Sequence, residues 1–256
     1  MKKLLALLLT AALVVTVFAG CGKNSSTESN GSSADSKKTI TMGTNATFPP
    51  FESVDDSGKI VGLDADIAAA IAEKLNMELV IKDMDFDSLI PAVKGGSIDF
   101  AMAGMTVTDE RKESVNFTDT YAKGVQVVIV KEGSAIKTVD DLKGKKIGVQ
   151  TGTTGDSYCT GDYGQENVKQ FANGPLAVAA LQNGQIDCVV IDQQPAKAYV
   201  ASASGLKILD TAYADENYAI AVSKDNTELL NNINKALSEL KAAGKIDEIV
   251  GKYIKE

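Results

Sequence analysis

Two stretches of the sequence, residues 92–100 (AVKGGSIDF) and residues 180–188 (ALQNGQIDC), share one pattern and lie 88 positions apart. Each is typical of a helix that ends at a glycine, followed by an Ile-Asp pair that opens a buried strand. The offset is far longer than the period of a solenoid repeat. We therefore expect two α/β lobes of similar build, with a ligand crevice at the carboxyl ends of their strands.

The chain from residue 39 onward alternates short β-branched runs with helical stretches, which indicates an α/β protein. Helices are predicted for residues 64–75 and 86–94. Near the C-terminus, an apolar stripe over residues 230–240 predicts a helix that ends at Gly244, and residues 246–253 predict a last short helix. The predicted strands cover residues 39–42, 79–82, 99–103, 124–130, 146–149, 168–171, 188–191, 207–209 and 218–222.

The composition excludes several classes of function. The chain has 256 residues, a formal net charge of -8 and no histidine, which excludes Ser–His–Asp and Cys–His catalysis and histidine metal sites. Three scattered cysteines are too few for a structural zinc or iron–sulfur site, so we expect no metal and no cofactor. Nucleic acid is not an expected partner of an acidic chain without clustered Lys and Arg.

The N-terminus indicates a protein held outside the cytoplasm. Residues 1–20 combine two lysines with an apolar run of signal-peptide length, and the small residues before Cys21 resemble a lipobox. We expect Cys21 to be lipidated, the alternative being an ordinary cleavable signal. The serine-rich residues 21–38 predict a flexible tether. The expected location is the cell membrane, with the chain lipid-anchored on the extracytoplasmic face.

One residue of the first half stands out by count, because Arg111 is the only arginine beside 25 lysines. A planar guanidinium can grip a carboxylate with two parallel hydrogen bonds, which an ammonium group cannot do. Gly104 and Thr106, just upstream, offer backbone N–H and hydroxyl donors to the same carboxylate. The alternative is that Arg111 forms a structural salt bridge.

Residues of the second half complete the set that an α-amino acid requires. The segment 152–155 (GTTG) follows a strand and precedes a predicted helix, where backbone amides bind anions. Asp192 ends an apolar strand, a costly place for a carboxylate unless a cation such as a ligand ammonium pairs it. Its alternative role is to cap the following helix. Phe48, Phe51 and Phe86 lie near loops of the first lobe, although each alone is more typical of a core residue.

With these residues in place, the sequence resembles the bacterial extracellular solute-binding proteins of the polar amino-acid type (family 3), the substrate-binding lipoproteins of ABC importers. The resemblance runs in order from residue 39 to the C-terminus. The stretches that carry it are residues 43–52 (GTNATFPPFE), 61–66 (VGLDAD), 86–91 (FDSLIP), 105–111 (MTVTDER), 117–121 (FTDTY), 148–154 (GVQTGTT) and 186–192 (IDCVVID).

The resemblance implies a type II periplasmic-binding-protein-like fold, in which two lobes joined by two crossover hinge strands close on a ligand. The crossings would fall near residues 122–125 and 218–221. Lobe 1 would then comprise residues 39–123 and 219–256, and lobe 2 residues 124–218. The implied partners are a free L-amino acid and an ABC permease in the membrane, with the protein acting as a monomer and not as an enzyme.

The resemblance also implies roles for single residues. Arg111 would hold the ligand α-carboxylate with Gly104, Thr106 and, from the second lobe, Thr154. Asp192 would hold the α-ammonium group. Phe48 and Phe86 would flank the ligand side chain. Asn45 stands where binders of basic amino acids often carry an acid, which disfavours a cationic ligand.

Several alternatives stay open at this stage. A dehydratase or lyase on the same fold would need an acid in the cleft, for which Glu52 and Glu110 are candidates, and a sensory module would act through a separate partner. Polar, cystine-like and basic amino acids all remain possible ligands. Cys159 and Cys188 form either a disulfide or, as we expect, two unpaired thiols.

Overall fold

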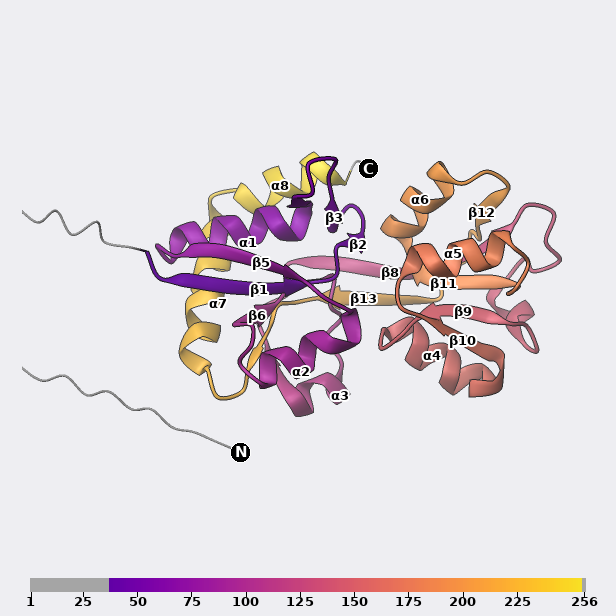
Figure 1. Cartoon of the computed structure of the whole chain (residues 1–256), viewed down its shortest axis with the longest axis horizontal. Coiled ribbons are helices and arrows are strands. Elements are labelled where there is room, and N and C mark those ends of the chain that lie inside the picture. Colours follow the sequence, from indigo (N-terminus) through magenta and orange to yellow (C-terminus); the bar gives the residue numbers. More distant parts are fainter. Residues whose placement is uncertain (1–36, 255–256) are drawn as a thin grey trace, which may run out of the picture. The chain divides into compact units, whose positions relative to one another are not determined.

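Two sheets organise residues 37–254, the part of the chain that the computed structural model describes (Figure 1). The first sheet has the order β5-β1-β6-β14-β7, in which β1 is parallel to β5 and β6 and β14 is antiparallel to its neighbours. Its strands are β1 (Thr39–Thr44), β5 (Glu78–Asp83), β6 (Phe100–Ala101), β7 (Val115–Phe117) and β14 (Ala221–Ser223). Its helices are α1 (Leu63–Lys74), α2 (Leu89–Lys94), α3 (Asp109–Ser114), α7 (Thr227–Ala242) and α8 (Lys245–Tyr253).

The second sheet has the order β10-β9-β11-β8-β12, and β13 also pairs with β8. Its strands are β8 (Ala122–Lys131), β9 (Ile147–Gln150), β10 (Val168–Phe171), β11 (Cys188–Asp192), β12 (Leu206–Ile208) and β13 (Ala214–Tyr218). Its helices are α4 (Thr154–Tyr163), α5 (Gly174–Gln182) and α6 (Gln193–Ser202). Single 3₁₀ turns cover Phe86–Ser88, Val139–Leu142 and Gln165–Asn167. The prediction of a two-lobe α/β fold is confirmed.

The repeated Ile-Asp motif makes the same contacts in both lobes. Asp99 accepts a hydrogen bond from the Thr41 N–H at 2.7 Å, and Asp187 accepts one from the Lys146 N–H at 2.8 Å, so each aspartate ties its own strand to the neighbouring one. The isoleucine before each aspartate is buried and occupies the space beside a strand glycine, Ile98 against Gly43 and Ile186 against Gly148. A Cβ at either glycine would overlap the isoleucine side chain.

Strands β8 and β13 run side by side from one lobe to the other (Figure 1). They form an antiparallel pair with Ala122 opposite Tyr218 and Gln126 opposite Ala214. The second crossing therefore involves Ala214–Tyr218, a few residues before the expected 218–221. The predicted strand 218–222 is wrong, because the chain changes sheets there: β13 pairs with β8, and β14 pairs with β6 and β7.

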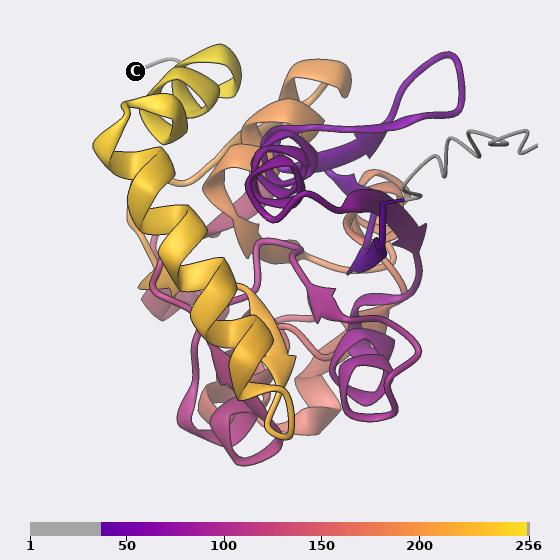
Figure 2. The same ribbon diagram turned by 90° about the vertical axis from the view of Figure 1, so that its left-hand side faces the viewer.

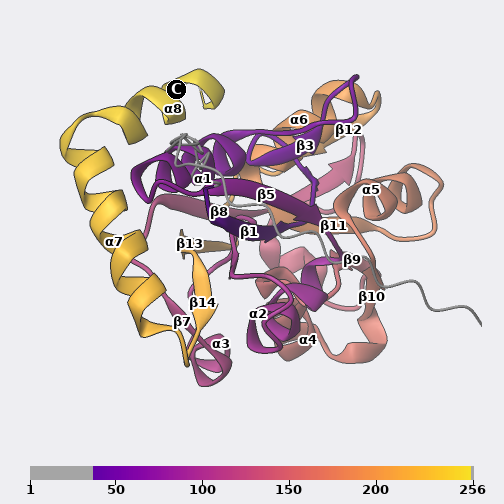
Figure 3. The same ribbon diagram turned by 60° about the vertical axis from the view of Figure 1, so that its left-hand side comes forward.

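The C-terminal helices return to the first lobe, as Figure 2 shows from the side and Figure 3 with labels. Helix α7 begins at the cap Asn226, whose side chain accepts from the Leu229 N–H, and buries the stripe that includes Ile233 and Leu237. Helices α7 and α8 pack against α1. A small sheet of β2 (Thr47–Phe48), β3 (Glu52–Val54) and β4 (Ile60–Val61) was not predicted, and it places Phe48 and Glu52 opposite each other.

Candidate ligand-binding site

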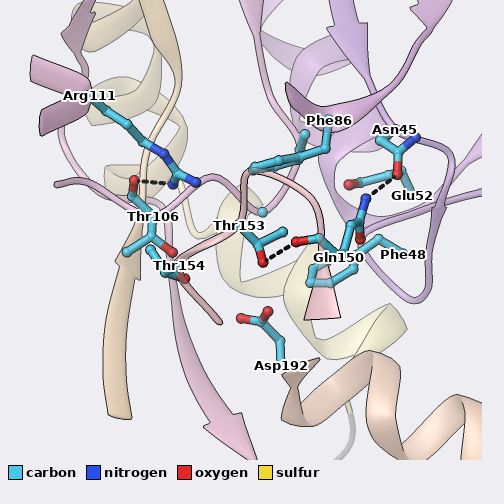
Figure 4. A pocket seen from close by; sticks show the side chains of 12 residues that line it. Asn45, Phe48, Glu52, Phe86, Thr106, Arg111, Gln150, Thr153, Thr154 and Asp192 are labelled. Carbon is cyan, nitrogen blue, oxygen red and sulfur yellow. Dashed lines mark hydrogen bonds between the residues drawn. The ribbon is translucent and has the colours of Figure 1, made fainter. Parts of the chain in front are cut away.

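A cavity between the lobes brings together all eight residues that the sequence analysis singled out for ligand binding (Figure 4). They are Asn45, Phe48, Phe86, Gly104, Thr106, Arg111, Thr154 and Asp192. Four further residues line the same cavity, namely Glu52, Ala103, Gln150 and Thr153. Arg111 and Asn45 lie toward opposite ends of the cavity in Figure 4.

Arg111 is oriented by backbone carbonyls from both lobes. Its Nη1 donates to the Thr106 carbonyl at 2.7 Å and its Nη2 donates to the Gly152 carbonyl at 3.0 Å. The guanidinium lies over the Phe86 ring, 5.3 Å from its centroid. None of the salt bridges among residues 37–254 includes Arg111, so the structural salt bridge considered above is absent from this region. Because a guanidinium carries five N–H donors, it retains donors for an anion in the cavity.

The start of α4 faces Arg111 from the second lobe. Thr153 caps this helix, since its hydroxyl accepts from the Asp156 N–H at 3.3 Å, and buried Thr154 is the first helical residue. The first amides of a helix have no partner within the helix, and they favour an anion. The cavity therefore has a positive end formed by Arg111 and the N-terminus of α4.

Asp192 supplies negative charge to the wall of the cavity. It occupies the N-cap position of α6, but its side chain makes no capping bond. Instead its Oδ2 accepts from Gln126 Nε2 at 2.8 Å and its Oδ1 accepts from the Tyr218 hydroxyl. Burial, and next the charge of Glu216, raise the pKa of Asp192 to about 7. The helix-cap alternative is thus wrong for the side chain.

Gly104 contributes to the cavity differently from the expectation. Its N–H donates to Asp64 Oδ2 at 2.9 Å, so this amide is already engaged within the first lobe. Its φ of 54° and a Cβ position only 2.8 Å from Phe48 Cε1 both favour glycine. Gly104 therefore gives Phe48 room to form the cavity wall.

The end of the cavity away from Arg111 contains two amides and a carboxyl group. Asn45 donates to the Met84 carbonyl at 2.9 Å, and its oxygen accepts from Gln150 Nε2 at 2.9 Å and from the Thr47 hydroxyl. Glu52 is fully buried beside them, and neither of its carboxyl oxygens accepts a hydrogen bond from another described residue. Burial, and next the charge of Asp64, raise the pKa of Glu52 well above its ordinary value.

Of the four additional lining residues, Glu52 and Gln150 change the chemistry of the cavity most. From the sequence alone, Glu52 is a candidate only as the acid of an enzyme, and Gln150 has no assigned role. The position of Gln150 at the end of a strand, two residues before the GTTG segment, is a signal that could have identified it. Phe51, by contrast, does not line the cavity and packs behind Phe48, with ring centroids 5.7 Å apart.

Apart from the hydrogen bonds made by the linking strands β8 and β13, three hydrogen bonds among the described residues join the lobes around the cavity. Besides the Arg111–Gly152 and Gln150–Asn45 bonds, the Tyr199 hydroxyl of α6 donates to the Thr47 carbonyl of β2. The three bonds come from different parts of the rim, so the lobes are held together in a closed arrangement.

Other expectations concern groups away from the cavity. Cys159 and Cys188 are buried and unpaired. Within residues 37–254 there is no cluster of three potential metal ligands and no helix long and apolar enough to cross a membrane. The predicted signal peptide, Cys21 and nearly all of the tether lie outside the described residues.

Comparison with protein families gives a match over nearly all of the described chain. The model of the bacterial extracellular solute-binding proteins, family 3, matches residues 40–256. The arginine-binding extracellular protein ArtP of Bacillus subtilis is 36% identical over 99% of this chain and 98% of its own length. A probable histidine-binding protein of Neisseria gonorrhoeae is 36% identical over 99% of this chain and 96% of its own length.

Solved structures give the same result. An ancestral arginine-binding protein bound to glutamine is 46% identical, with a TM-score of 0.82 over 86% of this chain and 99% of that protein. The arginine-, lysine-, histidine-binding protein ArtJ of Geobacillus stearothermophilus is 35% identical, with a TM-score of 0.81 over 86% of this chain and 96% of that protein.

Proposed function

The chain belongs to the bacterial extracellular solute-binding proteins of family 3, and we propose that it captures an L-amino acid between its lobes and delivers it to the permease of an ABC importer. The observation that carries this function is the cavity itself, which places a positive end opposite a carboxylate-rich wall. Relatives that match over nearly their whole length are named as an arginine-binding protein and a probable histidine-binding protein.

The α-carboxylate fits the positive end of the cavity. Arg111 is already oriented by two carbonyls and offers further N–H groups, and the N-terminus of α4 at Thr154 offers amides from the other lobe. A carboxylate held there bridges the lobes. Asp192 then accepts hydrogen bonds from the α-ammonium group. Because closure excludes water, both ionic contacts are stronger than they would be in solvent.

The ligand side chain extends between Phe48 and Phe86 toward Glu52, and we infer that it is cationic. Glu52 is a buried carboxyl group whose close neighbour is a second carboxyl group, that of Asp64, and this arrangement is costly unless a ligand donor reaches it. The amide at Asn45, which disfavours a cationic ligand at the level of sequence, does not supply a free acceptor, because its oxygen already accepts from Thr47 and Gln150. Burial and the nearby Asp64 favour the neutral form of Glu52 in the ligand-free protein. We infer that a cationic side chain favours the ionised form, and that Glu52 then supplies the negative charge next to the position where the resemblance places it.

A thermal-shift screen of the twenty amino acids tests whether the protein binds an amino acid and whether that amino acid is cationic. The protein is residues 37–256, which form one compact unit, unfolded and refolded beforehand to remove carried-over ligand. We expect L-arginine, L-lysine or L-histidine to raise the unfolding midpoint, since a ligand present at a thousandfold excess over its Kd adds about 4 kcal/mol. A flat screen would contradict amino-acid binding.

The matched variant Glu52→Gln tests the side-chain assignment separately. It should weaken binding of L-arginine about tenfold or more and leave L-glutamine nearly unchanged, because only the first loses an ionic partner. Equal losses for both ligands would place Glu52 outside the side-chain contacts. A preference of the wild-type protein for L-glutamine over every cationic amino acid would contradict the cationic ligand but leave the transport function intact.

The mode of action we propose is capture without chemical conversion. The relatives reported above are named as binding proteins, and of the two candidate acids only Glu52 lines the cavity. Incubation of the protein with its ligand, followed by chromatography, should return the ligand unchanged. Release of ammonia or water from it would instead favour the dehydratase or lyase.

We propose further that the chain acts as a monomer anchored by a lipid on Cys21, on the extracytoplasmic face of the membrane. The sequence before Cys21 supports this proposal. Labelled palmitate should be incorporated by the wild-type chain in bacterial cells and not by Cys21→Ala, which should be released into the medium. Labelling that persists in the variant would exclude Cys21 as the anchor.

A further inference from the structure

Glu216 is a buried carboxylate that stands behind the wall of the cavity and that no step of the proposed function uses. It lies on β13, one of the two strands that link the lobes, and is 4% exposed. Its Oε2 accepts from Thr106 Oγ1 at 2.9 Å and from Gln126 Nε2 at 3.0 Å. No described residue donates to its Oε1. So sparsely bonded a buried carboxylate is costly unless positive charge lies nearby.

The hydrogen bonds of Glu216 determine which groups face the cavity as acceptors. A threonine hydroxyl has one hydrogen and a carboxylate can only accept, so the Thr106 hydrogen points to Glu216. Thr106 lines the cavity, and its Oγ1 therefore presents lone pairs there. Gln126 Nε2 has two hydrogens, and it donates to Asp192 as well as to Glu216. Both Thr106 Oγ1 and Asp192 are consequently acceptors toward the ligand.

Backbone and side-chain contacts hold Thr106 and Asp192 in place relative to strand β13. Thr106 forms a β-bridge with Tyr218, flanked by bonds from the Val107 N–H to the Asn217 carbonyl at 3.0 Å and from the Ala219 N–H to the Met105 carbonyl at 3.1 Å. Tyr218 in turn donates to Asp192. The two acceptors are thus held relative to each other by the end of β13, the strand that also carries Glu216.

We propose that Glu216 is a positioning residue for the amino end of the ligand: it turns the Thr106 hydroxyl into an acceptor and, with Asp192, surrounds the α-ammonium group with negative charge. The inference rests on the proposed function, because it concerns amino-acid recognition in the same cavity. Loss of the Glu216 charge weakens the contacts to the ammonium group. Because the same charge raises the pKa of Asp192, binding is compared at pH 8, where Asp192 is ionised in both proteins. The contacts to the carboxylate are not weakened, because the charge of Glu216 acts on Arg111 in the wild-type protein and its loss leaves the Arg111 charge to the ligand.

The test compares two ligands that differ only at the α-carbon. Wild-type protein and Glu216→Gln are titrated calorimetrically with L-arginine and with 5-guanidinopentanoic acid, which keeps the carboxylate and the guanidinium but has no ammonium group. We expect the variant to bind L-arginine about tenfold or more weakly, and to bind the second ligand equally well or more tightly. If the screen names L-glutamine, the pair is L-glutamine and 4-carbamoylbutanoic acid.

The matched control is Asp215→Asn, which removes the same charge from the preceding residue of β13, an exposed one. It should change neither affinity by more than about twofold. Circular dichroism and the ligand-free unfolding midpoint report whether each variant folds. If Glu216→Gln does not fold, Thr106→Val replaces it in the test, because it removes the hydroxyl that Glu216 orients. We expect Thr106→Val to lose affinity for L-arginine but not for 5-guanidinopentanoic acid. Thr106→Ser, which keeps the hydroxyl, should bind L-arginine as the wild-type protein does.

Two results would overturn the proposal. Equal loss for both ligands would show that Glu216 merely supports the structure, and unchanged affinity for both would show that its charge does not reach the amino end. Failure of the wild-type protein to bind any amino acid would refute the proposed function itself, and the inference with it. The wild-type titration thus separates the two failures.

Discussion

Arg111 joins three parts of the molecule through one side chain. Its guanidinium contacts the Thr106 carbonyl of its own lobe, the Gly152 carbonyl of the other lobe and the face of Phe86. An ammonium group has only three hydrogens and no planar fork. A lysine at this position cannot hold both carbonyls and also bind a carboxylate with two bonds.

Arg111→Lys should therefore weaken binding of the preferred amino acid tenfold or more, equivalent to about 1.4 kcal/mol. Isothermal titration calorimetry measures the change. Lys112→Ala, on the exposed side of the same short helix, is the matched control and should leave the affinity within about twofold. An unchanged Kd for Arg111→Lys would remove the carboxylate clamp from the proposed mechanism.

The raised pKa of Asp192 makes binding dependent on pH. An α-ammonium group pairs with the ionised form, but at a pKa of about 7 the ligand-free protein holds a proton on Asp192 below neutrality. Affinity should rise from pH 5 to about 7, by up to tenfold per pH unit, and then level off. Titration in buffers of different ionisation enthalpy should show proton release on binding at pH 6. Asp192→Asn should abolish most binding and this release together.

The same shift has the opposite effect on folding. The ordinary pKa of an aspartate is 3.8, so the folded ligand-free protein binds this proton more tightly than the unfolded chain. The contribution of Asp192 to stability is present at low pH and is lost as the pH rises from about 4 to about 7.

For ligand affinity, a binding profile that is flat from pH 5 to 8 would show that Asp192 is ionised throughout.

Residues with a distinctive local context could be predicted from the sequence, and residues defined by distant partners could not. Arg111 stands out as the only arginine, and Asp192 as a carboxylate that ends an apolar strand. The role of Glu216 depends on Thr106, which is 110 positions away, and nothing near either residue indicates the contact. Glu52 looks like a loop charge until β2 and β3 pair and bury it.

At the scale of elements, the paired strands β8 and β13 connect the lobes and also support the cavity. Tyr218, at the end of β13, lies across Gly124 of β8 and donates to Asp192. A Cβ at Gly124 would overlap the Tyr218 Oη and Cζ atoms, so the tyrosine has room only because residue 124 is glycine.

Gly124→Ala should displace Tyr218 from Asp192, destabilise the fold by about 1–3 kcal/mol through overpacking, and weaken ligand binding. Urea unfolding and calorimetry measure the two effects. The control is Gly161→Ala in α4, where a Cβ meets no atom within 4 Å and should add about 0.5–1 kcal/mol of stability. Normal stability and affinity of Gly124→Ala would mean that the paired strands β8 and β13 accommodate the added methyl group without displacing Tyr218.

The helices were easier to predict than the strand breaks. The stripe of Ile233, Leu237 and Leu240 repeats every three or four residues and is buried along α7, so its period is visible in one segment. Residues 218–222 are continuously apolar after Tyr218, and only pairing shows that Tyr218 belongs to one sheet and Ala221 to the other. A periodic apolar pattern indicates which face of a segment is buried, but it does not indicate which neighbouring element covers that face.

On the scale of the whole molecule, closure depends on a few polar contacts across the rim. The Tyr199 hydroxyl of the second lobe donates to the Thr47 carbonyl of the first. A typical intramolecular hydrogen bond contributes about 1 kcal/mol net, enough to change an open–closed equilibrium about fivefold.

Tyr199→Phe should shift the ligand-free protein toward the open state and weaken ligand binding about fivefold, with little change in unfolding midpoint. Small-angle X-ray scattering with and without ligand measures the shift as a larger radius of gyration before binding. Tyr253→Phe, whose hydroxyl donates to Asp66 within the first lobe, is the control and should leave both unchanged. Equal radii for Tyr199→Phe and wild type would show that other contacts hold the lobes closed.

The order of strands in the first sheet has a consequence for a chain emerging from the ribosome. Strand β14 lies between β6 and β7, although it is synthesised after every strand of the second sheet. A nascent chain that has reached Tyr218 holds all six strands of the second lobe, while β7 still lacks the neighbour that attaches it to β6. The first lobe, whose synthesis begins first, is therefore completed last, when the C-terminal segment adds β14 between β6 and β7.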